Sequence, residues 1–169
     1  MRIWTQSIGV LALTFLVTAA VTGCLTTGPV GELGETGDVM PPYGVITTQQ
    51  ATNVILALQD DPEFVLLDIR TPAEVEAGHI SGAINLDFYG PAFRDNLTAL
   101  DRDKIYLIYC RSGNRSGQAF DMMEELGFER VHDLGGGIKQ WMAAGYPVCA
   151  GPLNAAHSCY GEFPRSSEA

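Results

Sequence analysis

The segment that decides the fold runs from Tyr106 to Ser116 and reads Tyr-Leu-Ile-Tyr-Cys-Arg-Ser-Gly-Asn-Arg-Ser. It begins within an apolar run, Ile105 to Tyr109, which has the composition of a buried β-strand. The cysteine that ends the run, Cys110, is followed by a polar loop with two arginines and a glycine, and then by apolar residues at helical spacing up to Gly127. The segment therefore predicts a strand, a cysteine loop and a helix, in that order.

This arrangement activates the cysteine. Backbone N–H groups of the loop and the positive end of the helix point at the sulfur, and both favour the thiolate over the thiol. Arg111 and Arg115 add positive charge. The alternative is a core cysteine at a strand end, because free cysteines are often buried. The polar residues after Cys110 would make a poor core, so we interpret the loop as a site where a nucleophilic sulfur meets an anionic substrate.

Strand and helix signals alternate over a domain predicted from 45 to 148. The expected elements are a helix after the capping box of Thr47 and Gln50, a strand at Phe64–Asp68, a helix from Thr71–Pro72, a strand at Ala83–Leu86, a helix at Phe93–Leu100, a strand at Arg130–Leu134 and a helix at Ile138–Ala144. Such alternation predicts an α/β fold, with a small parallel sheet that carries helices on both faces. The loop of Cys110 then lies at the carboxyl end of a strand, where open α/β sheets bind ligands.

Three ordered motifs in this domain resemble those of the rhodanese-like sulfurtransferases. They are Leu67–Arg70 with Glu74 and Gly78–Asn85, then Cys110–Arg115, and finally Leu134–Trp141 with Gly145–Val148. The first motif departs from the family pattern at one position, where Ser81 replaces a common proline. The resemblance covers the whole predicted domain and implies the rhodanese fold.

The resemblance also implies a reaction. Cys110 would attack the outer sulfur of thiosulfate or a similar anionic donor and carry it as a persulfide, and a thiol or cyanide would then accept the sulfur. The implied substrate-binding residues are those of the loop: Arg111, Ser112, Gly113, Asn114, Arg115 and Ser116. The two arginines would bind the donor and stabilise the departing sulfite as charge-assisted donors. The family needs no metal and no organic cofactor for this chemistry.

Other polar residues of the first motif have two interpretations. Asp68 and Arg70 support the site either by orienting the loop or by pairing with neighbours as residues of the fold. His79 is either a proton donor or a structural hydrogen-bonding residue, and the second is favoured because a preformed thiolate needs no general base.

Two rival functions remain open at this stage. One is a phosphatase or arsenate reductase on the same fold, whose relatives have five residues between cysteine and arginine. Here four residues separate Cys110 from Arg115, which favours sulfur as the cargo. The other is a binding or sensing module without turnover, although such modules often lose the cysteine that this chain keeps.

The N-terminal residues predict export. Residues 1–23 contain one charge, Arg2, and an apolar run from Ile8 to Val21, which is typical of a signal peptide and too short to span a bilayer. An uncleaved anchor that starts near Ile3 is the alternative. Val21-Thr22-Gly23-Cys24 resembles the bacterial lipobox, which implies a lipid anchor on Cys24 and a place on the outer side of a membrane. Residues 24–44, rich in Gly, Pro and Thr, are expected to form a flexible tether.

The remaining cysteines and the net charge complete the predictions. In an exported protein Cys149 and Cys159, in an extension over 149–169, suggest a disulfide, although either could instead resolve an oxidised or persulfidated Cys110. The formal net charge of −10, without a basic stripe, argues against nucleic acid as a partner and favours a monomer.

Overall fold

The computed structural model describes residues 40–153 and 158–160 of the chain. The signal peptide predicted at 1–23, the lipid site at Cys24, most of the tether and the last nine residues lie outside the described residues. Within the described part, no helix has both the length and the apolar character that a membrane crossing requires.

The elements alternate as the sequence predicts. In chain order they are β1 (Gly44–Ile46), α1 (Thr48–Leu58), β2 (Phe64–Asp68), α2 (Pro72–Ala77), β3 (Ile84–Asn85), α3 (Phe93–Thr98), β4 (Ile105–Tyr109), α4 (Asn114–Glu125), β5 (Val131–Leu134), α5 (Gly137–Ala143), β6 (Val148–Ala150) and β7 (Ser158–Tyr160). The short strands β1, β6 and β7 are additions to the predicted set, because three residues carry too little periodicity to be recognised.

The main sheet is parallel throughout, with strand order β1-β5-β4-β2-β3. Strand β4 therefore lies at the centre, between β5 and β2. In its register Asp68 pairs with Tyr109, the residue that precedes Cys110. The cysteine loop thus leaves the middle of the sheet at its carboxyl edge, next to the end of β2.

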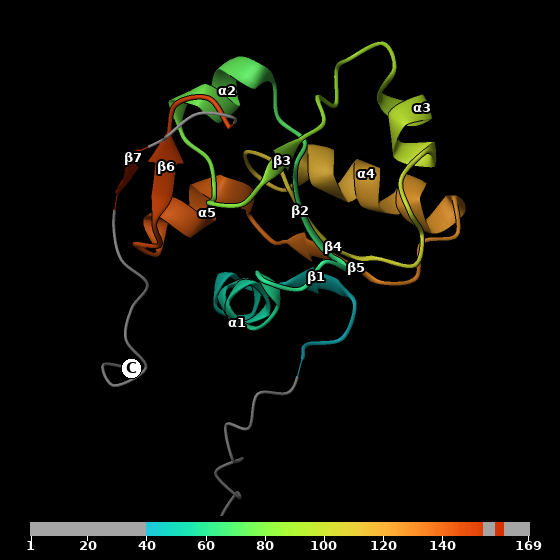
Figure 1. The fold of residues 1–169 in the computed structure, drawn as a ribbon, viewed down its shortest axis with the longest axis horizontal. Helices are drawn as coiled ribbons and strands as arrows, with labels where there is room; N and C mark the ends of the chain where they lie inside the picture. The colour runs from blue at the N-terminus through green and yellow to red at the C-terminus, as the bar shows by residue number, and fades with distance from the viewer. Residues whose placement is uncertain (1–39, 154–157, 161–169) are drawn as a thin grey trace, which may run out of the picture. The chain divides into compact units, whose positions relative to one another are not determined.

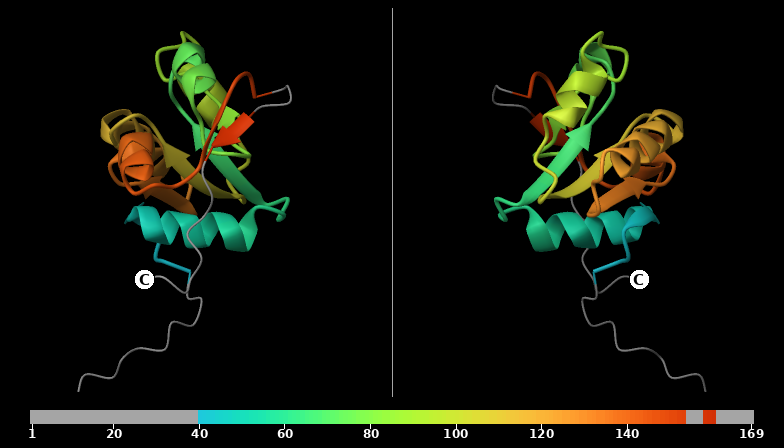
Figure 2. Two further views of the ribbon diagram at one scale, coloured as in Figure 1. Left: turned by 90° about the vertical axis from the view of Figure 1, so that its left-hand side faces the viewer. Right: turned by 90° about the vertical axis from the view of Figure 1, so that its right-hand side faces the viewer.

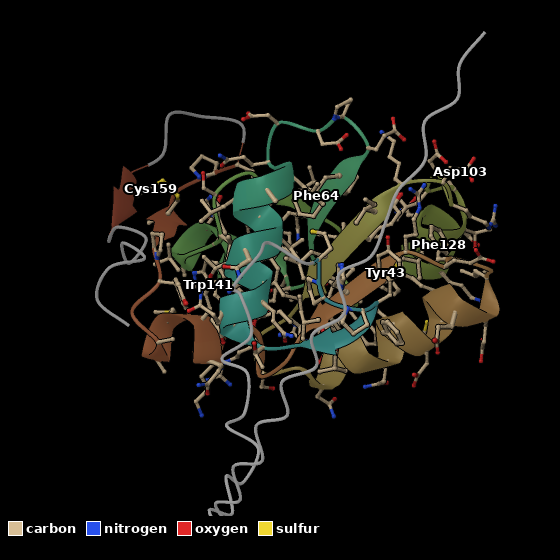
Figure 3. The ribbon with its side chains drawn as sticks, turned by 90° about the horizontal axis from the view of Figure 1, so that it is seen from below. Tyr43, Phe64, Asp103, Phe128, Trp141 and Cys159 are labelled. Carbon is tan, nitrogen blue, oxygen red and sulfur yellow. A yellow bond between two sulfur atoms is a disulfide. The ribbon has the colours of Figure 1, made fainter. Side chains whose placement is uncertain are left out.

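Helices cover both faces of the sheet, which confirms the predicted α/β class (Figure 1). One core joins the sheet to α1 and α5, and the other joins it to α3 and α4. Trp141 and Phe128 mark these two cores in Figure 3, which shows the protein from below. The side views of Figure 2 show α1 along its length beneath the strands. A sheet covered on both faces explains why its strands are continuous apolar runs.

Capping residues fix where the two helices next to β2 begin. Thr47 and Gln50 form a complete capping box at α1, and Thr71 and Glu74 form another at α2, as their spacing predicts. After the C-terminal end of α4, Gly127 has a φ of +84°, the left-handed conformation expected after a helix.

The C-terminal extension folds back onto the domain. Strands β6 and β7 pair antiparallel, and a disulfide joins Cys149 to Cys159 across them. Strand β6 lies beside α2 (Figure 1), where the backbones of Cys149 and His79 exchange two hydrogen bonds of 2.8 and 2.7 Å. The extension is therefore attached to the residues that follow α2.

Candidate active site

Cys110 lies directly after β4 and is almost fully buried, with 1% of its surface exposed. The backbone N–H of Gly113 donates to its Sγ at 3.2 Å, and the hydroxyl of Ser116 lies 3.6 Å from the same atom. Gly113 can turn the loop back onto the sulfur because it adopts a φ of +92°, a conformation that other residues rarely take. The loop therefore surrounds the sulfur with donors, as the strand–loop–helix pattern predicts.

These donors favour the thiolate. Burial by itself raises the pKa of the Cys110 thiol, but hydrogen bonds from the Ser116 hydroxyl and from the backbone N–H groups of Ser116, Ser112 and Gly113 outweigh it. The result is a pKa below the ordinary cysteine value. A thiolate held this way is a ready nucleophile.

The glycine-rich turn at the start of α5 holds the cysteine loop through backbone contacts. The N–H groups of Ile138 and Lys139, at the start of α5, donate to the carbonyl oxygens of Cys110 and Arg111 at 2.9 and 3.0 Å. The preceding Gly137 packs so closely that a Cβ atom there would lie 2.4 Å from the Cys110 oxygen. The third sequence motif thus serves to hold the second one in place.

Arg115 is held by an acidic partner. Its guanidinium donates two hydrogen bonds, each 2.8 Å long, to the carboxylate of Glu74 in the first turn of α2. The pair lowers the pKa of Glu74 to about 2 and raises the pKa of Arg115 above its ordinary value. The Tyr89 ring, 68% exposed, stacks against the same guanidinium at 5.3 Å from its centroid. The charge of Arg115 near Cys110 is therefore partly neutralised.

Arg111 has a different environment from Arg115. It is exposed and lines an open groove of about 370 Å³ together with Lys139. The remaining wall residues are Arg70, Glu74, Ala77, Gly78, Ile138, Met142 and Val148. Because Arg70 and Glu74 pair with Asp68 and Arg115, the charge that the groove offers to a ligand comes mainly from Arg111 and Lys139.

The other loop residues have lesser roles in the geometry. Ser112 is exposed and offers its N–H to the sulfur. Asn114 begins α4 and accepts hydrogen bonds from the side chain of Gln118, at 3.2 Å through its backbone oxygen and at 3.1 Å through its side-chain oxygen. The structure therefore turns the Asn114 side chain along its own helix.

Asp68 and Arg70 form a buried ion pair beside the loop. The Arg70 guanidinium contacts the Asp68 carboxylate at 2.5 Å and donates to the carbonyl oxygens of Glu74 and Gly78 at 3.1 and 2.6 Å. The side-chain amide of Asn85 donates to the backbone oxygens of both Asp68 and Arg70 at 2.8 Å. These contacts tie β2 to both ends of α2, which agrees with the structural interpretation of the pair.

His79 is fully buried and its ring Nδ1 lies 3.0 Å from the Val75 carbonyl oxygen. Its backbone pairs with Cys149. Both contacts fit the structural role that the sequence favours over proton donation.

Among the residues that the structure describes, no group of three or more His, Cys, Asp or Glu side chains is placed to hold a metal ion.

Comparison with known proteins decides the family. Residues 52–144 match the model of the rhodanese-like domain. The chain belongs to the rhodanese-like family. Within this family, the chain is 40% identical over 93 residues to a sulfurtransferase of Allochromatium vinosum, a match that covers 55% of this chain and 85% of that protein. It is 36% identical over 100 residues to the thiosulfate sulfurtransferase GlpE of Pseudomonas putida, covering 59% of this chain and 88% of the relative.

A solved structure supports the same assignment. The rhodanese-related protein of Thermoplasma volcanium superposes with a TM-score of 0.54 at 34% identity, over 63% of this chain and 97% of that one. The sequence-based assignment to rhodanese-like proteins is thus confirmed.

Some neighbours of the cysteine cannot be assigned a role at the site from sequence alone. Glu74 lies in the first motif and in a capping box without an assigned role at the cysteine, Lys139 lies in the third motif without an assigned function, and Asp133 stands within a predicted strand. Their proximity to the loop depends on the pairing and packing of distant segments, so no local pattern reveals it.

Proposed function

We propose that the protein is a thiosulfate-type sulfurtransferase in which Cys110 carries the transferred sulfur. The observation that supports this most directly is the environment of Sγ, which accepts hydrogen bonds from Gly113 and Ser116 and has a lowered pKa. The same donors that stabilise a thiolate can stabilise the negative outer sulfur of a persulfide. Membership of the family and the sulfurtransferases among its relatives agree with the proposal.

The reaction takes place in two displacements. The Cys110 thiolate attacks the outer sulfur of thiosulfate, a new S–S bond forms, the S–S bond of the donor breaks, and sulfite leaves with the bonding electron pair. A thiolate or cyanide then attacks the outer sulfur of the persulfide, forming a new persulfide or thiocyanate and restoring the Cys110 thiolate. No net oxidation takes place and no cofactor is required.

Positive charge guides the anionic donor to the site. Arg111 and Lys139 line the groove beside the loop, on a chain whose formal net charge is −10. Arg115, braced by Glu74, places its remaining positive field near the sulfur and stabilises sulfite as it departs. The donor is therefore a small anion, and the acceptor is a thiol or cyanide.

Persulfide detection tests the proposal. Protein incubated with thiosulfate should gain one sulfur, located on the peptide that contains Cys110, and cyanide should then release it as thiocyanate. Cys110→Ala should abolish both results. A wild-type chain that never forms the persulfide would overturn the proposal and favour a binding or sensing module.

We also propose that the chain is exported and held at a membrane by a lipid on Cys24, with the domain as a monomer. The lipobox-like sequence Val21-Thr22-Gly23-Cys24 after an apolar run supports export and the lipid anchor, and the formal net charge of −10 supports the monomer. Cys24→Ser should leave an uncleaved precursor or release the protein from membranes. A mature chain that starts elsewhere without lipid would contradict this proposal.

A further inference from the structure

A buried carboxyl group lies next to the sulfur site without a role in the mechanism above. Asp133 belongs to β5 and only 3% of its surface is exposed. Its Oδ1 atom has no hydrogen-bond partner among the described residues. Burying a carboxyl group with an unpaired oxygen is costly, so this position calls for an explanation.

The register of the sheet places Asp133 on the same face as the sulfur. Asp133 pairs with Ile108 on β4, and Val131, two residues earlier on β5, belongs with Ile108 and Cys110 to the core beneath α3 and α4. Because paired residues and residues two apart share a face of a sheet, the Asp133 side chain points toward α4. Its neighbour His132 lies on the opposite face, where it stacks on Tyr43.

Ser116 connects this carboxyl to the sulfur. Its hydroxyl is fully buried on the first turn of α4, lies 3.6 Å from the Cys110 Sγ and 3.3 Å from the Gly113 carbonyl oxygen, and is close enough to Asp133 to lower the pKa of that carboxyl. A serine hydroxyl has a single proton to donate. The thiolate, the Asp133 carboxylate and the Gly113 carbonyl oxygen therefore compete for one donor, and only the first two carry a negative charge.

We propose that Asp133 is a positioning residue for Cys110. When Asp133 carries its own proton, it donates to the Ser116 oxygen and directs the Ser116 hydroxyl at the sulfur. When Asp133 is ionised, it draws that hydroxyl away from the sulfur. No covalent bond between heavy atoms forms or breaks in this change. Only the direction of the hydrogen bonds and the ionisation of Asp133 differ between the two states.

The titration range makes the competition relevant near neutral pH. Burial raises the pKa of Asp133 to about 6, with the nearby Ser116 hydroxyl opposing the shift and the charge of Asp121 on α4 adding to it. Asp121 from α4 is the charged group that acts on the Asp133 carboxyl, and Cys110 at the end of β4 shares its face of the sheet. Below about pH 6, the Ser116 donor belongs to the thiolate, and above it the carboxylate competes for that donor.

The inference rests on the proposed role of Cys110 as a nucleophile, but its test does not require sulfur transfer. The alkylation rate of Cys110 in the full chain is measured against pH by peptide-resolved mass spectrometry, which separates it from Cys24. Asp133→Asn keeps the shape, removes the charge and gives Ser116 a permanent amide donor. At about pH 6.5 it should raise the alkylation rate about three- to tenfold, which corresponds to a Cys110 pKa lowered by roughly 0.5–1.

A double-variant comparison separates the hydrogen bond from the charge. In a Ser116→Ala background, Asp133→Asn should change the rate less than about twofold, because the connecting hydroxyl is gone. Asp121→Asn, which removes a charge near Asp133 without contacting Ser116, should also change it less than about twofold. An equal effect of Asp133→Asn in both backgrounds would show that charge alone acts and would overturn the proposal.

The wild-type profile keeps the proposal testable if Asp133→Asn does not fold. Its alkylation profile should show an additional inflection near about pH 6 that is lost in Ser116→Ala. Identical profile shapes in the two proteins would overturn the proposal. Persulfide formation on Cys110, measured separately, tests the proposed function independently of this proposal.

Discussion

Arg115 and Glu74, which lie 41 residues apart in the sequence, form a bidentate ion pair with two nitrogen–oxygen distances of 2.8 Å. The pair joins the first turn of α4 to the first turn of α2. Because the loop of Cys110 runs directly into α4, this contact holds the loop in place. It also partly neutralises the charge of Arg115. Arg115 thus has two roles, as a cation near the sulfur and as a brace for the loop.

Replacing Arg115 tests the first of these roles. Arg115→Ala should lower kcat/KM for thiosulfate about tenfold or more, a loss of roughly 1.5–3 kcal/mol, from the usual strength of charged hydrogen bonds. The variant removes a cation that favours the thiolate and leaves the Glu74 carboxylate unpaired beside an incoming dianion. Thiocyanate formation at varied thiosulfate concentrations and titration of Cys110 measure the two effects.

Two further variants serve as controls for Arg115. Glu74→Gln combined with Arg115→Ala should recover part of the loss, because the unpaired carboxylate is gone. Arg94→Ala removes an exposed arginine whose contact with Glu125 is 3.7 Å long, and it should leave the kinetics unchanged. Unchanged thiosulfate kinetics and an unshifted Cys110 pKa in Arg115→Ala would show that Arg115 is incidental to the reaction.

The same pair makes stability depend on pH. The hydrogen bond to Arg115, with help from Thr71, lowers the pKa of Glu74 from 4.5 to about 2. The stabilisation is therefore complete above pH 4.5 and is lost as the pH falls through about 2. With the Glu74 side chain 30% exposed, solvent weakens the pair, so Glu74→Gln should cost about 1–2 kcal/mol at neutral pH and much less near about pH 2.

Urea unfolding at several pH values measures this loss. Thr71→Ala is the comparison variant, because it removes the hydroxyl hydrogen bonds of the capping box and leaves the ion pair in place, so most of the pH dependence should remain. A free energy of unfolding with the same pH dependence in wild type and Glu74→Gln would contradict the prediction.

The local parts of the fold could be predicted from the sequence. Cys110 marks the end of β4 because an apolar run stops there, and Thr71 with Glu74 marks the start of α2 because the capping box has a fixed spacing. The order of strands in the sheet, by contrast, depends on long-range pairing. For this reason the position of β1 at the edge beside β5 has no local signal.

The same distinction applies to the site. Both loop arginines can be recognised in the sequence, but their partners cannot. In the folded chain Arg115 pairs with Glu74, whereas Arg111 lines the groove with Lys139. Partner choice between residues far apart in sequence depends on tertiary packing, which a single sequence does not reveal.

Lys139 should act on donor binding more than on the chemical step. Lys139→Glu should raise the KM for thiosulfate about three- to tenfold with little change in kcat, and added salt should reduce the difference. Lys104→Glu makes the same charge change directly before the first residue of β4, at the end of the strand opposite the cysteine loop. It should alter the KM for thiosulfate less than about twofold. Equal effects of the two variants would assign the change to net charge rather than to the groove.

The disulfide should stabilise the C-terminal hairpin. Cys149 and Cys159 are ten residues apart, and closing a loop of this size contributes roughly 2–3 kcal/mol. A chain with both Cys149→Ser and Cys159→Ser should have a free energy of unfolding that is lower by that amount in urea titrations. Its Cys110 persulfide should still form. Loss of acceptor transfer at unchanged stability would instead indicate a resolving cysteine.

Gly137 should tolerate no side chain, because the turn before α5 and the cysteine loop are in backbone contact. Its φ is +58°, and a Cβ atom would lie 2.4 Å from the Cys110 oxygen and 2.8 Å from both the Arg111 carbonyl carbon and the Ser112 nitrogen. These are backbone atoms, so the whole loop would have to move. Gly137→Ala should therefore lower the free energy of unfolding by more than about 3 kcal/mol and raise the Cys110 pKa in any molecules that fold.

Gly145→Ala separates backbone strain from this collision. Gly145 has a φ of +81°, and a Cβ atom there would meet no other atom within 4 Å, so alanine introduces strain alone, at a cost of roughly 1–2 kcal/mol. Urea unfolding and alkylation of Cys110 should show a larger loss of stability for Gly137→Ala and a change in sulfur reactivity for that variant only. Equal losses at the two positions, with normal reactivity in both, would mean that the glycine turn does not hold the loop against the sulfur.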